Sequence, residues 1–186
     1  MNKRNLNKRI KQSISATAKA VHMDTLLKHQ HSGVNMSYNF IHNFVGFDVL
    51  RIKEARKSMQ EPVSLETYIQ TLTLHELGHA VDREALLDSL PRTIEIYLMK
   101  RKYTAFEYRR SINHFAMIIE EHVMNIEFEE TAWRNAEMLN RFYGIVNWGD
   151  FEKVKAHSLA TYKNLYENDL RLYQALTAEM SIQAAG

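Results

Sequence analysis

The sequence predicts an α+β protein that is mostly α-helical, with a small antiparallel sheet or hairpin and long additional helices. Neither glycine nor proline occurs between Pro91 and Gly144, or between Gly149 and Gly186. Stretches of that length, rich in Leu, Ile, Phe and Tyr, are typical of helices rather than of disordered chain. Residues 34–41 differ, because apolar and polar side chains alternate there with the period of two that is typical of a strand.

The expected elements follow one another along a single domain, residues 1–186. A basic N-terminal helix covers 1–32, and strands cover 33–53, as Val34–Ile41 and Phe47–Ile52. A helix over 64–88 begins at Ser64, a good N-cap residue. Apolar residues at intervals of three and four predict a helical segment over 92–143 and a C-terminal helix over 150–186.

The composition excludes several classes of protein. The chain has no cysteine, so it holds no disulfide framework, cysteine-ligated zinc finger, iron–sulfur cluster or cysteine nucleophile. No apolar run approaches the roughly 18 residues of a membrane span. The basic N-terminus is not followed by the apolar segment of a secretory signal. We therefore expect a cytoplasmic protein with no membrane partner.

The charges are unevenly distributed. The chain has 24 basic and 22 acidic residues, but residues 1–60 hold 11 of the basic and only 3 of the acidic ones. A basic N-terminal third could attract nucleic acid or another anionic partner. A solvated helix face explains the same residues without any partner, and we prefer that interpretation because few aromatic residues lie among the basic ones.

The chemically informative motif lies inside the helix expected over 64–88. His75 and His79 are four residues apart, so on a helix both imidazoles project from one face and can reach a single Zn²⁺ ion. Glu76 follows the first histidine directly, which turns its carboxylate away from the ligands and toward a water molecule at the metal. Gly78 is costly within a helix, which indicates that another backbone approaches closely there.

A catalytic zinc ion needs a third protein ligand, which must be His, Asp or Glu in a chain without cysteine. Asp82 is too close to His79 to serve without distorting the helix. The metzincin pattern fails, because Ala85 stands where its third histidine should be. In the next long helix, apolar neighbours mark three carboxylates as inward-facing and leave the choice among them open: Glu120, Glu121 and Glu129.

The segment from His75 to Asp82, followed downstream by Glu129-Glu-Thr-Ala-Trp133, resembles the gluzincin metallopeptidases. It is most similar to the ImmA/IrrE-type proteins of phages, mobile elements and bacteria, over roughly residues 34–140. The resemblance implies a zincin-like helix beneath the small sheet and makes Glu129 the third zinc ligand. The spacing from His79 to Glu129 is longer than is usual in such proteins, so Glu121 and Glu130 stay open as alternatives.

We expect a zinc metallopeptidase in which Glu76 is the general base. The resemblance implies a narrow range of protein substrates, such as a transcriptional regulator. A substrate peptide can add to the exposed edge of one of the expected strands. The alternative is a non-catalytic, metal-binding regulatory module of phage or mobile-element origin that binds a partner or nucleic acid.

A peptidase also needs a donor that stabilises the oxyanion of the reaction. The sequence does not choose among five candidates: Tyr97, Tyr108, His114, His122 and Tyr143.

Overall fold

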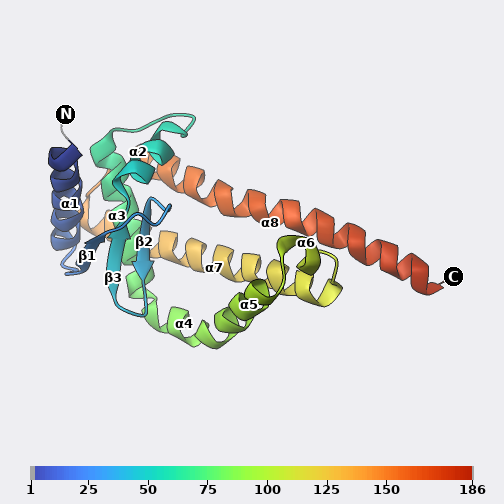
Figure 1. Ribbon diagram of the computed structural model, residues 1–186. Helices are drawn as coiled ribbons and strands as arrows, with labels where there is room; N and C mark the ends of the chain where they lie inside the picture. Colours follow the sequence, from blue (N-terminus) through green and yellow to red (C-terminus); the bar gives the residue numbers. More distant parts are fainter. Residues whose placement is uncertain (1–2, 186) are drawn as a thin grey trace. The chain divides into compact units, whose positions relative to one another are not determined.

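The computed structural model describes residues 3–185 and confirms the mostly helical α+β fold class (Figure 1). The elements are, in order, α1 (Lys3–Ala20), β1 (Leu26–His29), β2 (Met36–Asn39), β3 (Phe44–Phe47), α2 (Val49–Lys57), α3 (Leu65–Val81), α4 (Arg83–Asp88), α5 (Leu90–Lys102), α6 (Ala105–Tyr108), α7 (Ile112–Tyr143) and α8 (Trp148–Ala185). No helix of this part of the chain is long and apolar enough to cross a membrane.

The described residues gather into two compact units. The first contains the chain as far as Leu87 together with Glu129–Ser158, and the second contains Asp88–Phe128 and the residues from Leu159 onward. Helices α7 and α8 contribute residues to both units. The single domain expected for residues 1–186 stays a prediction.

The sheet of the first unit has three strands in the order β1-β3-β2. Strands β2 and β3 form the expected antiparallel hairpin, in which Tyr38 lies opposite Val45. Strand β1 pairs with the other side of β3 and runs parallel to it, so the sheet is mixed rather than purely antiparallel. Among the described strands, β2 has a neighbour on one side only.

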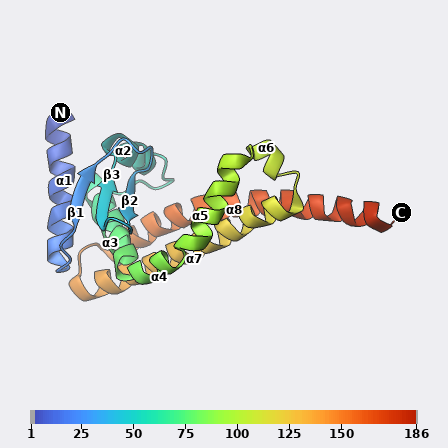
Figure 2. The ribbon, with the colours of Figure 1, turned by 60° about the horizontal axis from the view of Figure 1, so that its bottom comes forward.

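The helix expected over 1–32 is wrong beyond Ala20. His22 adopts a positive φ of 56°, and the backbone N–H groups of His22 and Met23 donate to the carbonyls of Lys19 and Ala18. This pair of hydrogen bonds is the Schellman motif, which ends a helix. The chain then extends into β1, which lies beside α1 in both views (Figures 1 and 2).

The strand expected over Phe47–Ile52 is also wrong, because β3 ends at Phe47 and a helix follows. The side chain of Asp48 accepts hydrogen bonds from the backbone N–H groups of Leu50 and Arg51, at 3.0 and 3.3 Å. This N-cap starts α2 and outweighs the strand preference of Val49 and Ile52. The expected strand Val34–Ile41 is confirmed in its central residues as β2.

The remaining helices lie where they were expected, but the structure divides two of the predicted helical segments into shorter helices. Helix α3 begins after Ser64, whose hydroxyl accepts from the N–H of Thr67 at 3.0 Å, as expected of an N-cap. The helix predicted over 64–88 is divided at Asp82 into α3 and α4. The segment predicted over 92–143 contains α5, α6 and α7, and the helix predicted over 150–186 is α8.

Helix α3 lies at the centre of the first unit and is buried on almost every side from Tyr68 to Gly78. It packs against α1, whose buried residues include Ile10 and Ile14, and against strand β2. Its centre carries the two histidines of the motif. A helix buried among other elements is therefore what holds those side chains in place.

The second unit has a separate core of Met99, Phe115 and Ile118. Tyr173 of α8 packs edge-on against Phe115, with ring centroids 5.7 Å apart. Ion pairs within this unit join α5 to α7 and the end of α6 to α8: Arg92 with Glu120, Lys100 with Glu121, and Arg109 with Asp169.

Candidate metal centre

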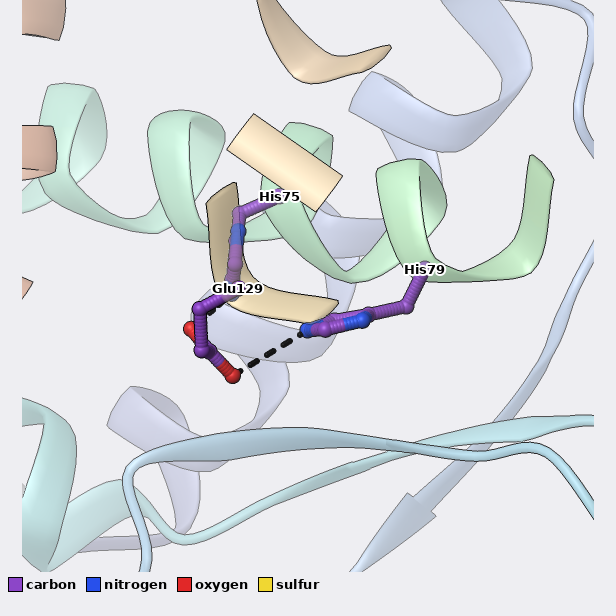
Figure 3. A group of neighbouring side chains, drawn as sticks. All are labelled: His75, His79 and Glu129. Atoms are coloured by element: carbon purple, nitrogen blue, oxygen red, sulfur yellow. Dashed lines mark ion pairs between the residues drawn. The ribbon is translucent and has the colours of Figure 1, made fainter. Parts of the chain in front are cut away.

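Two histidines of α3 and one glutamate of α7 point toward one another within the first unit (Figure 3). The Nε2 atom of His75 lies 3.1 Å from Oε2 of Glu129, and the Nε2 atom of His79 lies 3.3 Å from Oε1 of the same carboxylate. One ligand atom from each residue lies within 4.8 Å of the others. Among residues 3–185, this is the group that could hold a metal ion.

The hydrogen bonding within this group is incomplete. Nδ1 of His75 is buried and has no hydrogen-bond partner among the described residues, and Oε2 of Glu129, although 3.1 Å from Nε2 of His75, does not meet it with the geometry of a hydrogen bond. Buried polar atoms are normally paired, because an unpaired one costs about 1–3 kcal/mol. Two imidazoles and a carboxylate with unused lone pairs at this spacing have the chemistry of a metal-ligand set. The group therefore fits a metal ion.

Charge also favours binding of a cation. Burial raises the pKa of the Glu129 carboxyl, but the adjacent imidazoles of His75 and His79 outweigh burial and hold this pKa well below its usual range. Burial lowers the pKa of His79, yet its hydrogen bond to Glu129 and the nearby carboxylates of Glu76, Glu129 and Asp82 raise it overall. The Glu129 carboxylate is thus ionised and can attract a cation.

Glu76 lies beside the three ligands without belonging to their group. Its side chain is buried, with 4% of the residue exposed, and it accepts a hydrogen bond from the backbone of Tyr38 in β2. Burial raises the pKa of this carboxyl, against the opposing influence of His75 and His79. A second buried carboxylate with a raised pKa, next to a ligand set, is typical of a general base.

Gly78 allows α3 and α7 to approach closely enough to form the group. A Cβ atom at this position would lie 2.1 Å from the carbonyl oxygen of Ala132 and 3.2 Å from the backbone nitrogen of Ala136. The amide of Asn135 donates a hydrogen bond to the carbonyl of Gly78 at 3.0 Å. The expectation of a close backbone approach at Gly78 is confirmed, and the approaching backbone belongs to the helix that carries Glu129.

Trp133 supports the first histidine from the same helix. Its ring is fully buried and stacks on the imidazole of His75, with centroids 4.3 Å apart and an angle of 21° between the planes. Phe151 also packs edge-on against the ring of Trp133, with ring centroids 5.6 Å apart. Because Trp133 lies one helical turn after Glu129, one face of α7 provides both a ligand and the surface that orients His75.

The other carboxylates considered for the third ligand lie in different surroundings. Glu120 and Glu121 belong to the second unit, where Arg92 and Lys100 respectively bind their carboxylates. Glu130 is exposed. Asp82 caps the end of α3, where its backbone N–H donates to the carbonyl of His79 at 3.2 Å. The structure brings Glu129, and none of these four, into the group with the two histidines.

The five candidates for stabilising an oxyanion make contacts elsewhere or are exposed. Tyr143 packs against His22, His114 packs at a tilt against Tyr103, and His122 contacts the carboxylate of Asp169. Tyr97 is 56% exposed and Tyr108 lies beside Arg109. The described contacts place none of them beside Glu76 or the three ligands.

Sequence reasoning missed two contributors to the site. The backbone of Tyr38 contacts Glu76. The alternating pattern around Tyr38 predicted a strand, but it did not predict that this strand would lie beside Glu76. Asn135 donates to the carbonyl of Gly78, and because a residue six positions after Glu129 does not share its face of the helix, the spacing gave no signal for it.

Comparisons with protein-family models, with curated proteins and with solved structures find no match to this chain. The candidate centre is defined by its own geometry, as a buried group of two imidazoles and one carboxylate that could hold a metal ion.

Proposed function

We propose that the chain is a zinc-dependent metallopeptidase of the gluzincin type, in which His75, His79 and Glu129 hold the metal. The convergence of these three side chains beside the buried carboxylate of Glu76 carries the proposal. Three nitrogen and oxygen ligands are the usual protein contribution to a catalytic zinc site, and two ligands of a tetrahedral zinc ion lie about 3.4 Å apart. The two separations between histidine and glutamate, 3.1 and 3.3 Å, end on different oxygens of the carboxylate and are close to that spacing.

The residues of the chain divide the chemistry between them. When bound, zinc supplies a Lewis acid that polarises the scissile carbonyl and lowers the pKa of water. Glu76 takes the proton from the attacking water and passes it to the leaving amine. Burial raises the pKa of Glu76 above that of an ordinary carboxyl, which brings its proton affinity closer to the neutral range where such a base works best.

The free edge of β2 supports a peptide as the substrate. Tyr38 of this strand contacts Glu76 through its backbone, so the edge and the general base are neighbours. A peptide in extended conformation can add to such an edge through main-chain hydrogen bonds, which would carry its scissile bond past the base. Of the two strands considered from the sequence, this favours β2, because the residues after Phe47 form α2.

The resemblance to the ImmA/IrrE-type proteins extends the proposal to the kind of substrate, namely one regulatory protein such as a transcriptional regulator. The alternative is a non-catalytic metal-binding module that serves a partner or nucleic acid. Glu76 argues against this alternative, because a purely structural metal site has no use for a buried base beside its ligands.

Metal analysis and a cleavage assay test the proposal together. Wild-type protein purified with added zinc is expected to hold about one zinc per chain and to cut a co-expressed regulator at one position. Glu76→Gln should keep the zinc and lose cleavage, whereas the matched control Glu130→Gln, an exposed neighbour of Glu129, should keep both. Protein without zinc refutes the proposal. Zinc without cleavage of any co-expressed regulator favours the metal-binding module.

A further inference from the structure

Helix α1 carries basic residues and no acidic residue over its whole length. Three of its exposed lysines, Lys8, Lys11 and Lys19, are separated by three and eight residues. At 100° per residue these positions fall within one side of the helix. We call these three residues the lysine stripe.

The lysine stripe has no partner within the described chain: none of its three side chains forms an ion pair there. Three lysines elsewhere differ, because Lys100 pairs with Glu121, Lys153 with Glu61 and Lys155 with Glu137. Helix α2, which packs against α1, adds Lys53 and Lys57, again without an ion-pair partner among residues 3–185. Of the described lysines that form no ion pair, five therefore lie in α1 and α2, and the others are Lys28 and Lys102.

This arrangement costs stability. Like charges three residues apart on a helix repel each other, as Lys8 and Lys11 do. A solvated face that served only the fold would gain from carboxylates placed among the lysines, and α1 has none. The pattern indicates a partner outside the chain.

The surroundings of α1 identify the kind of partner. Its apolar residues, including Ile10 and Ile14, are buried, so no apolar face is left to enter a lipid surface. The described part of α1 has no aromatic side chain on which unpaired bases could stack. Amide side chains at Asn5 and Gln12 are exposed beside the lysines and can bond to phosphate oxygens.

We propose that the lysine stripe binds the phosphate backbone of a double-stranded nucleic acid. From Lys8 to Lys19 the stripe extends about 16 Å along the helix, which is enough to meet several phosphates of a duplex, and α-helices fit the major groove of DNA. The contacts are to the backbone, so binding is not specific for sequence. This function is independent of the metal centre and would bring a peptidase to regulators that are themselves bound to DNA.

Fluorescence anisotropy with a labelled 20-base-pair DNA duplex tests the proposal on the full-length chain. Wild type is expected to bind at 50 mM salt and to weaken as salt rises. The triple variant Lys8→Gln/Lys11→Gln/Lys19→Gln should bind at least tenfold more weakly, and its slope of log K against log salt should be shallower by about 3 if each lysine meets one phosphate. The triple change to arginine, which keeps the charge, should retain wild-type affinity.

A control of equal charge separates the lysine stripe from net charge. Arg101→Gln/Lys102→Gln/Arg110→Gln removes three exposed basic residues of the second unit and should leave the slope unchanged. An RNA duplex of the same sequence shows whether the backbone of DNA, of RNA or of both is bound, and each of these results supports the proposal. Glu76→Gln and chelation of metal should not affect binding, so failure of the peptidase proposal leaves this one standing.

Three results would overturn the inference. The first is no binding of either duplex at 50 mM salt. The second is an equal loss of affinity in the two glutamine variants, which would show that only net charge matters. The third is binding to phosphatidylcholine vesicles with 30% phosphatidylserine that is tighter than binding to the duplex, or displacement of the labelled duplex by polyglutamate as effectively as by unlabelled duplex. Either result would assign the stripe to a different anion.

Discussion

Replacing Gly78 by alanine tests the link between helix packing and the metal centre. The added Cβ atom would lie 2.1 Å from the carbonyl oxygen of Ala132, whereas ordinary contacts begin at 3.4 Å. The obstructing atom belongs to the backbone, so no side chain can rotate away. Helices α3 and α7 must therefore separate locally by about 1.3 Å, the difference between the two distances.

The size of the effect follows from two opposing terms. Overpacking of this kind costs about 1–3 kcal/mol, and the upper end applies because a backbone atom obstructs the methyl group. Alanine recovers about 1 kcal/mol of helix propensity relative to glycine. The net loss is about 2 kcal/mol, which corresponds to a decrease in Tm of about 4–8 °C for a chain of this size.

The same displacement reaches the ligand set. Glu129 lies three residues before Ala132 on α7, so a shift of the helix moves its carboxylate away from His75 and His79. Metal–ligand distances are tolerated within about 0.2 Å, much less than the shift. Metal affinity should fall at least tenfold, as measured by competition with a chelating dye.

Gly149→Ala is the matched control. A Cβ atom there would meet only Oδ1 of Asn147, at 3.7 Å. We expect an unchanged or slightly higher Tm and unchanged metal affinity. If Gly78→Ala melted at or above the wild-type temperature and bound metal as tightly as wild type, the argument from close approach would be wrong. Lower stability with unchanged affinity would show that α7 yields without moving Glu129.

Three further predictions concern the same unit. Trp133→Leu should weaken metal binding at least tenfold while Trp133→Phe retains most of it, because phenylalanine can still stack on His75; equal losses in a chelator competition would argue against stacking. The pKa of His79 is raised in the metal-free fold, so its stabilising contribution is present below about pH 6.5 and is lost as pH rises through the raised value. Denaturation midpoints of metal-free protein should thus fall as pH rises above about 6.5, and a flat profile, or the same fall in His79→Gln, would contradict this assignment. Asp48→Ala removes the N-cap of α2 and should cost about 1 kcal/mol in urea unfolding, whereas a loss below about 0.3 kcal/mol would mean that the cap is replaced by water.

Local chemistry explains how far the fold could be predicted from the sequence. The alternation around Tyr38 correctly predicted β2, and Ser64 correctly predicted the start of α3, because both signals lie within a few residues of the feature. Strand β1 was missed because a histidine, rather than the usual glycine, takes the left-handed position that ends α1. The pairing of β1 with β3 is a long-range contact that no local pattern specifies.

For the candidate site too, local geometry could be predicted from the sequence and tertiary contacts could not. The spacing of His75 and His79 follows from helix geometry, and the structure places both in one group with Glu129. Periodicity could not separate Glu129 from Glu120 and Glu121, because all three have apolar neighbours on their own helix. What separates them is tertiary: basic side chains of α5 bind Glu120 and Glu121, and such partners are not visible in the pattern of a single helix.

The placement of the ligands on α3 and α7 has a consequence for the chain between them. A metal held by His79 and Glu129 would close a loop that contains α4, α5, α6 and the first part of α7. Such a closure restricts the unfolded chain in the way that a disulfide does, and its stabilising effect grows with the logarithm of loop length. In a chain without cysteine, an ion of this kind would act as a reversible cross-link, which acid or a chelator could open and which thiol reagents could not.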